Sequence, residues 1–189
     1  MSENSSRTAL VAAHGWWHPD WVGPFYPDDM PEEWQLTYYA NFFHTVVIPA
    51  AAWGDDPAAQ AAQWREDVHD KFVFVAETPA PAAGLEALGD ALLGTVGEGA
   101  AGRWLHAEGD LTAATPEAPL LAVGEAGPGL VIAALPAAEG DAMALRRAWE
   151  ALRDAAPVGA RVLLVVRGEE PSTPPVLEQA RTVAELLGL

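Results

Sequence analysis

The chain has 189 residues, 50% of them hydrophobic, which is enough to build a core and excludes a disordered polypeptide. Its 27 acidic residues outnumber its 10 basic residues and give a net charge of -17, so nucleic acid and membranes are poor partners. The lack of cysteine excludes disulfides, thiolate nucleophiles and thiolate metal sites. With no secretion signal and no long apolar span, we expect a cytoplasmic protein.

The first 80 residues alternate between apolar runs and helix signals. They predict strands at 8–13, 44–49 and 72–76, helices at 31–43 and 57–68, and a loop broken by prolines at 16–31. Asp56 and Pro57 supply an N-cap and a first-turn proline for the second helix. Continuous apolar strands separated by helices are typical of a parallel sheet that is buried on both faces.

The second half is less regular before the same alternation returns. It predicts strands at 129–135 and 161–166 and helices at 140–155 and 174–187. Residues 78–128 form an irregular stretch rich in Gly, Ala and Pro, with a helix over 84–96 and an extra strand at 104–107 or 120–123. We expect residues 1–189 to form a single domain.

Residues 14–27 read H-G-W-W-H-P-D-W-V-G-P-F-Y-P, and residues 32–43 read E-E-W-Q-L-T-Y-Y-A-N-F-F. This order resembles the YecE-like family, the domain of unknown function 72, whose pattern is G-W-x-Y-x-x-W-x-G-x-F-Y-P followed by a helix with W-L-x-Y-Y-A-x-x-F. The segment F-V-F-V-A-E-T-P at 72–79 is similar to the family's F-x-F-x-V-K-x-P. The positions in step are Gly15, Trp16, Trp21, Gly23, Phe25, Tyr26, Pro27, Trp34, Leu36, Tyr38, Tyr39, Ala40 and Phe43.

The resemblance implies β/α barrel units, because the family is similar to TIM barrels. The predicted fold class is therefore α/β, an incomplete or modified TIM-type (β/α) barrel with about five to six mainly parallel strands. Only about five β/α units are evident, whereas a TIM barrel has eight. We expect the last three units to be missing.

The chain also departs from the family pattern where strands end. The replacements are Val47 for Glu, Pro49 for Asn, Glu77 for Lys, Ala134 for Gln and Val165 for Glu, whereas Arg167 is retained. Groups at the carboxyl ends of barrel strands line the site in such folds. These replacements therefore remove acid, base and binding groups that the resemblance implies.

The candidate pocket combines histidine, aromatic and charged side chains. Its members are His14, Trp16, Trp17, His18, Asp20, Trp21, Tyr26, Glu77 and Arg167. Glu77 and Arg167 lie at the ends of predicted strands, where an ion pair is a more common arrangement than an acid and base couple. At least one of the adjacent Trp16 and Trp17 is expected to be exposed beside the pocket.

The aromatic residues allow two interpretations. They offer stacking platforms for a sugar or a nucleobase. The favoured alternative is structural, because Trp34, Tyr38 and Phe42 recur at the spacing of a helix face that packs on a core. In that interpretation Trp21, Phe25 and Tyr26 hold the long loop over one end of the barrel.

Two histidines and an aspartate come nearest to a metal site. His14, His18 and Asp20 are close in sequence, but Gly15 and Pro19 favour a loop, and no fourth ligand is evident. No metal and no cofactor are therefore expected.

The preferred functional hypothesis is a shortened, catalytically eroded barrel that acts as a binding or protein-interaction module. Five strands cannot close a barrel, so a homodimer or a protein partner is expected to cover the open sheet edges. The alternative is a hydrolase for a small or sugar-like substrate that uses Glu77, Asp20 and a histidine in a Trp-lined cleft. A structural remnant that acts only within a larger complex is a third reading.

Overall fold

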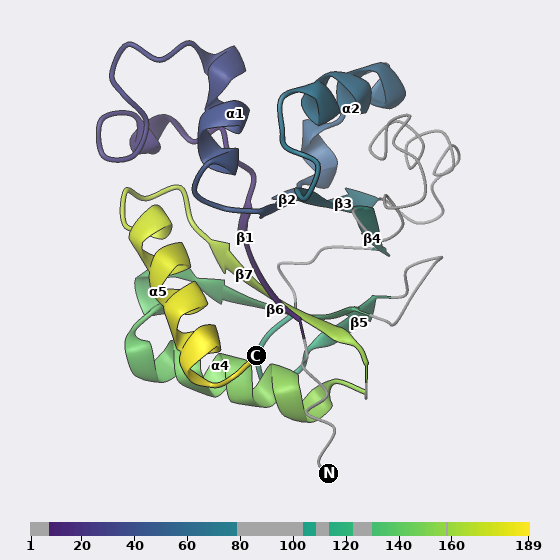
Figure 1. The fold of residues 1–189 in the computed structure, drawn as a ribbon, viewed down its shortest axis with the longest axis vertical. Coiled ribbons are helices and arrows are strands. Elements are labelled where there is room, and N and C mark those ends of the chain that lie inside the picture. The colour runs from purple at the N-terminus through teal and green to yellow at the C-terminus, as the bar shows by residue number, and fades with distance from the viewer. Residues whose placement is uncertain (1–7, 79–103, 109–113, 123–129, 158) are drawn as a thin grey trace.

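The computed structural model describes residues 8–78, 104–108, 114–122, 130–157 and 159–189. Its centre is a seven-stranded sheet with the order β4-β3-β2-β1-β7-β6-β5 (Figure 1). The strands are β1 Ala9–His14, β2 Thr45–Ile48, β3 Val73–Thr78, β4 Trp104–Glu108, β5 Leu120–Ala122, β6 Leu130–Pro136 and β7 Arg161–Arg167. The helices are α1 Gln35–Ala40, α2 Pro57–Glu66, α4 Ala142–Ala155 and α5 Thr173–Leu186. The helix predicted over 84–96 lies outside the described residues.

The last strand of the chain lies beside the first. β1 pairs in parallel with β7, with Leu10 opposite Leu163 and Ala13 opposite Val166. This is how the two ends of a β/α barrel meet, because the sheet closes on itself. The prediction that the last three units are missing is therefore wrong. The shortening lies between β4 and β6, where β5 pairs antiparallel with β6.

The two ends of the sheet approach each other. β4 and β5 are the terminal strands of the hydrogen-bonded order, so a strand forms at each of the two places that the sequence offered as alternatives for one extra strand. Cα atoms of β4 and β5 come within 8 Å of one another, so the sheet curls until its edges face each other. The fold is therefore an incomplete TIM-type barrel, with parallel strands throughout except for β5.

Helices α4 and α5 cover one face of β6, β7 and β1 (Figure 1). α4 turns a regular apolar stripe toward the sheet, made of Leu145, Ala148, Trp149 and Leu152. Trp149 Nε1 donates a hydrogen bond of 2.9 Å to Ala180 O, which fastens α4 to α5. None of the helices in the described part of the chain is long and apolar enough to cross a membrane.

The strands bury apolar side chains on both faces, as their continuous apolar runs predict. One face packs against the helices. The opposite face, which we call the inner face, carries the inner apolar cluster of Ala12, Val47, Val73, Val75, Leu130, Ile132, Ala134, Leu163 and Val165. Val47, Ala134 and Val165, which replace polar residues of the family pattern, are at most 2% exposed.

The loop after β1 is held by buried aromatic residues. Trp21 and Tyr26 are fully buried, and Tyr26 Oη donates a hydrogen bond of 2.6 Å to Trp16 O. Phe25 is partly buried and packs edge-on against Trp21. The prediction that these residues fix the loop is confirmed.

The face of α1 that packs on the core differs from the predicted one. Trp34 is 63% exposed and Phe42 is 39% exposed, so they do not form a buried stripe with Tyr38. The buried hydrophobic side chains are instead Leu36, Tyr39 and Ala40 of α1 and Phe43, which lies just after the helix. These four residues also follow a helical spacing. Because the helix has only six residues, the periodicity of the sequence is too short to show which of the two faces is buried.

Candidate functional site

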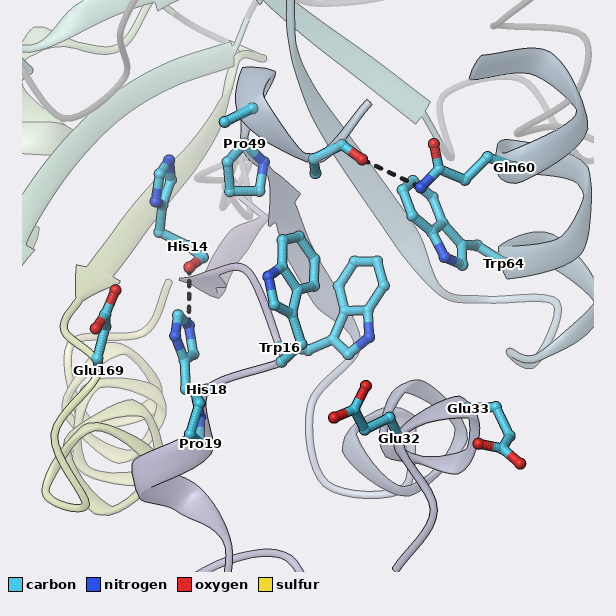
Figure 2. A pocket seen from close by; sticks show the side chains of 13 residues that line it. His14, Trp16, His18, Pro19, Glu32, Glu33, Pro49, Gln60, Trp64 and Glu169 are labelled. Carbon is cyan, nitrogen blue, oxygen red and sulfur yellow. Dashed lines mark hydrogen bonds between the residues drawn. The ribbon is translucent and has the colours of Figure 1, made fainter. Parts of the chain in front are cut away.

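A cleft of about 820 Å³ opens at the carboxyl ends of the strands (Figure 2). Its lining comes from the loop after β1, the start of the α1 region, the segment between β2 and α2, α2 itself and the loop after β7. The residues are His14, Trp16, Trp17, His18, Pro19, Glu32, Glu33, Pro49, Ala51, Ala52, Gln60, Trp64 and Glu169. The carboxyl ends of parallel strands are where β/α barrels build their sites.

Three indole rings form one wall of the cleft. Trp16 meets both Trp17 and Trp64 at right angles, with ring centroids 4.4 Å and 5.0 Å apart. Trp16 is only 5% exposed, whereas Trp17 is 39% exposed. The expectation that at least one of the two adjacent tryptophans is exposed is therefore met. In Figure 2 the Trp16 ring lies at the centre of the lining, with Trp64 beyond it.

A histidine and a buried glutamate meet at the floor of the cleft. His14 Nε2 donates to Glu77 Oε1 at 3.0 Å. The other carboxylate oxygen of Glu77 accepts the backbone N–H of Ala50 at 3.1 Å, and Trp53 Nε1 donates to Glu77 O at 3.2 Å. Glu77 is only 4% exposed, so these contacts hold it rigidly. The contacts also fix the orientation of the His14 ring.

His18 stands beside this pair. Its Nε2 donates to His14 O at 3.0 Å, so in the neutral ring Nδ1 is the hydrogen-bond acceptor. Burial lowers the pKa of His18 below its ordinary value, although the hydrogen bond to His14 and the charge of Glu169 act in the opposite direction. His18 is therefore neutral at pH 7 and offers an acceptor rather than a positive charge.

The structure brings together part of the pocket that the sequence predicted. His14, Trp16, Trp17 and His18 line the cleft, and Glu77 contacts it through His14. The other four predicted members do not line it: Trp21 and Tyr26 are fully buried, Asp20 is exposed outside the lining, and Arg167 ends β7 apart from it.

Sequence reasoning missed the remaining polar lining. Glu32 and Glu33 begin a helical segment, where acidic residues are common for structural reasons, and Gln60 gives no signal at all. Glu169 follows Arg167 by two residues, so the rule that sites form after strand ends would have found it. Trp64 on α2 also lines the cleft, and its position in the sequence gives no signal of that role.

A metal centre does not emerge from these groups. Among the residues that the structure describes, no three His, Asp or Glu side chains are placed to hold an ion together. His14 and His18 each use Nε2 in a hydrogen bond, the first to Glu77 and the second to His14 O.

Comparisons with known proteins agree with the fold. A family model described as "Protein of unknown function DUF72" matches residues 10–115. A solved DUF72 family protein from Thermotoga maritima is similar, with a TM-score of 0.51 and 11% identity over 96% of this chain and 99% of the other. One from Enterococcus faecalis has a TM-score of 0.51 and 13% identity over 96% of each chain. Among curated proteins no match was found. The family resemblance inferred from residues 14–43 is confirmed, and this chain belongs to the DUF72 family of proteins of unknown function.

Proposed function

We propose that this protein binds a small, sugar-like molecule in the cleft and does not convert it. The observation that carries the proposal is the wall formed by Trp16, Trp17 and Trp64 along a cleft of about 820 Å³. Clefts of this size suit small molecules, and indole rings present the apolar faces on which sugar rings stack.

The polar lining supports a ligand rich in hydroxyl groups. Gln60 offers an amide, His18 offers an acceptor nitrogen, and Glu32 and Glu169 offer carboxylate oxygens, so donors and acceptors are mixed. Gln60 Nε2 already donates to Ala52 O at 3.1 Å, which orients the amide (Figure 2). The described lining contains no Lys or Arg, so the cleft itself does not favour an anion.

The inner face of the sheet supports binding without turnover. Catalytic groups of β/α barrels sit at the strand ends, where they point into the barrel. Val47, Ala134 and Val165 occupy such inward positions and belong to the inner apolar cluster. Their methyl groups supply neither a nucleophile nor an acid or base.

The test is a titration with a panel of neutral mono- and disaccharides, followed by intrinsic tryptophan fluorescence and calorimetry. At least one sugar is expected to bind saturably, and Trp17→Ala is expected to weaken that binding at least tenfold. Trp34→Ala is the matched control, because Trp34 is 63% exposed and lies outside this cleft. Saturable binding that is equal in the two variants, or no binding by any sugar, would contradict the proposal.

One observation favours a second candidate, a hydrolase for a small or sugar-like substrate. His14 lines the cleft, and Glu77 accepts its Nε2 hydrogen, so His14 Nδ1 is left to take a proton from water. The water oxygen would bond to the carbon under attack, and the proton would pass on to the leaving group. Asp20 drops out of this hypothesis because it does not line the cleft.

Aryl glycosides and aryl esters distinguish the two candidates. The hydrolase candidate predicts release of the phenol by the wild type and at least a hundredfold slower release by His14→Gln. The binding proposal predicts no release by either protein, with sugar affinity retained in the wild type.

We also propose that the protein self-associates through its sheet edges. β4 and β5 end the hydrogen-bonded order, and terminal strands carry backbone groups that can pair with another chain. β4 and β5 approach each other, with Cα atoms within 8 Å, but no hydrogen-bonded pairing joins them among the described residues. Light scattering at micromolar concentration is expected to give the mass of a dimer, whereas the mass of one chain, 20.0 kDa, would contradict self-association.

A further inference from the structure

Carboxylates flank the tryptophan wall of the cleft. Glu32 and Glu33 line the cleft from the start of the α1 region, and Glu169 lines it from the loop after β7. In Figure 2 Glu32 and Glu169 lie on opposite sides of Trp16. Burial lowers the pKa of His18 and the charge of Glu169 opposes this effect, so these two side chains lie near each other. A molecule in the cleft therefore meets negative charge on two sides.

These carboxylates have no ion-pair partner within the described part of the chain. The described lining contains no Lys or Arg, and the ion pairs of the described residues do not include Glu32, Glu33 or Glu169. His18 is neutral at pH 7, so it does not offset them. A cleft lined by charge of one sign raises the local concentration of ligands of the opposite sign. The cleft therefore favours a cation over a neutral molecule of the same shape.

The hydrogen-bonding groups of the lining favour a ligand rich in donors. His14 and His18 each donate from Nε2, to Glu77 and to His14 O, so Nδ1 of each neutral ring is an acceptor. The ionised carboxylates can only accept. Among the described lining residues, side-chain N–H donors remain on Gln60 and on the tryptophan rings. A protonated amine complements this lining, because it has three N–H donors and no acceptor.

The tryptophan wall suits the same cation. The face of an indole ring attracts cations more strongly than other aromatic side chains do, because the negative part of the ring quadrupole lies there. Trp17 is 39% exposed and is free to contact a ligand, whereas Trp16 packs edge-on against it and is only 5% exposed. The apolar face of a sugar ring stacks on indole as well. A sugar that carries a protonated amine uses both properties of the wall.

We propose that the ligand of the cleft is an amino sugar, a sugar-like molecule with a protonated amine, and that Glu32 and Glu169 attract the amine. This assignment rests on the proposed function, because it concerns the ligand of the same site. Both carboxylates are exposed, so water screens their charge and each contributes modestly. Together with the indole face they are expected to give a preference of about fivefold or more for an amino sugar over its neutral parent.

The test is calorimetric titration with glucosamine, galactosamine and mannosamine and with the neutral parents glucose, galactose and mannose, at pH 6.5, where the amines are mainly protonated. At least one amino sugar is expected to bind about fivefold or more tightly than its parent. N-acetylation removes the charge and is expected to abolish the preference. Ethanolamine carries the charge without the sugar ring and is expected to bind about tenfold or more weakly than the amino sugar.

Variants of the carboxylates separate the charge of the cleft from the net charge of the protein. Glu32→Gln and Glu169→Gln each remove one charge from an exposed lining residue and are expected to reduce the preference for the amino sugar. Glu178→Gln is the matched control and is expected to keep the preference, because Glu178 is exposed on α5 outside the lining. Sodium chloride is expected to weaken binding of the amino sugar more than binding of its neutral parent.

Equal affinities for amino sugars and their neutral parents would overturn the amino-sugar assignment and leave the proposed function standing. The assignment is also overturned if Glu178→Gln reduces the preference as much as the two cleft variants do. Ethanolamine that binds as tightly as the amino sugar would overturn it too, since the sugar ring would then contribute nothing. Binding by none of the sugars would overturn both proposals.

Discussion

Glu77 Oε1 lies 3.0 Å from His14 Nε2, and this contact joins the carboxyl ends of β3 and β1 across the intervening strand β2. The glutamate also accepts the N–H of Ala50, which follows β2. One buried carboxylate thus ties together the ends of three neighbouring strands beneath the cleft. Its removal should affect the stability of the whole sheet end.

We predict that Glu77→Ala lowers the free energy of unfolding by about 2–4 kcal/mol, because the N–H of Ala50 and the His14 ring lose a buried acceptor. Urea denaturation followed by circular dichroism measures this change. Glu169→Ala is the matched control in the same cleft, and as an exposed side chain it should change stability by less than about 0.5 kcal/mol. Equal losses in the two variants would show that the buried contacts of Glu77 contribute nothing.

The strands β1, β2, β3, β6 and β7 were predictable from sequence because each contains a continuous apolar run. The predicted 161–166 and the observed Arg161–Arg167 differ by one residue, and the predicted 44–49 contains Thr45–Ile48. The pairing of His14 with Glu77 was not predictable, because the two residues are 63 positions apart. Their contact depends on the strand order, which a single sequence does not contain.

The position of the last strand in the sheet was likewise not predictable from sequence. A count of β/α units predicts that the chain stops early, but it cannot tell which units are absent. The pairing of Leu10 with Leu163 answers that question, since it places the last strand beside the first. Arg167 could be assigned to a strand end from sequence, whereas the burial of its Nε without a hydrogen-bond partner among the described residues is a property of the packed structure.

Tyr39 joins the first two strands through its hydroxyl group. Its Oη donates to Thr45 O at 2.9 Å and accepts the N–H of Ala13 at 3.2 Å, in a fully buried position. Tyr39→Phe should cost about 1–3 kcal/mol, because it leaves buried backbone groups without this partner. Tyr38→Phe is the control on the same helix, with a half-buried ring and no hydroxyl bond among the described residues. If urea denaturation gives equal losses for both, the hydroxyl bonds of Tyr39 are not stabilising.

The contact between His44 and His69 leads us to predict that the free energy of unfolding falls in acid. His69 Nδ1 accepts the N–H of Lys71, so its Nε2 carries the hydrogen and donates to His44 Nδ1 at 3.1 Å. Burial lowers the pKa of His44, and the charges of His69, Arg181 and Lys71 lower it further. The pair is bonded in this way only while both rings are neutral.

Because the folded state lowers the pKa of His44, the unfolded chain takes up the proton first as the pH falls. The contribution of this pair is therefore complete above the ordinary value of 6.5 and declines as the pH falls through it. Unfolding free energies measured by urea at pH 7.5 and 5.5 should show a smaller decline for His44→Gln than for the wild type. The same decline in both proteins would mean that His44 titrates normally in the fold.

A substitution on the inner face tests whether this face can still hold a polar group. Val165 stands where the family pattern has Glu, and it is fully buried in the inner apolar cluster. Val165→Glu should therefore lower the free energy of unfolding by about 3 kcal/mol or more, because a carboxylate there loses its hydration among apolar side chains. Val22→Glu is the control, since Val22 is 37% exposed and should tolerate the charge within about 0.5 kcal/mol. If urea denaturation finds the two variants equally stable, the inner face is hydrated and can still hold a polar site, which would remove the main argument for binding without turnover.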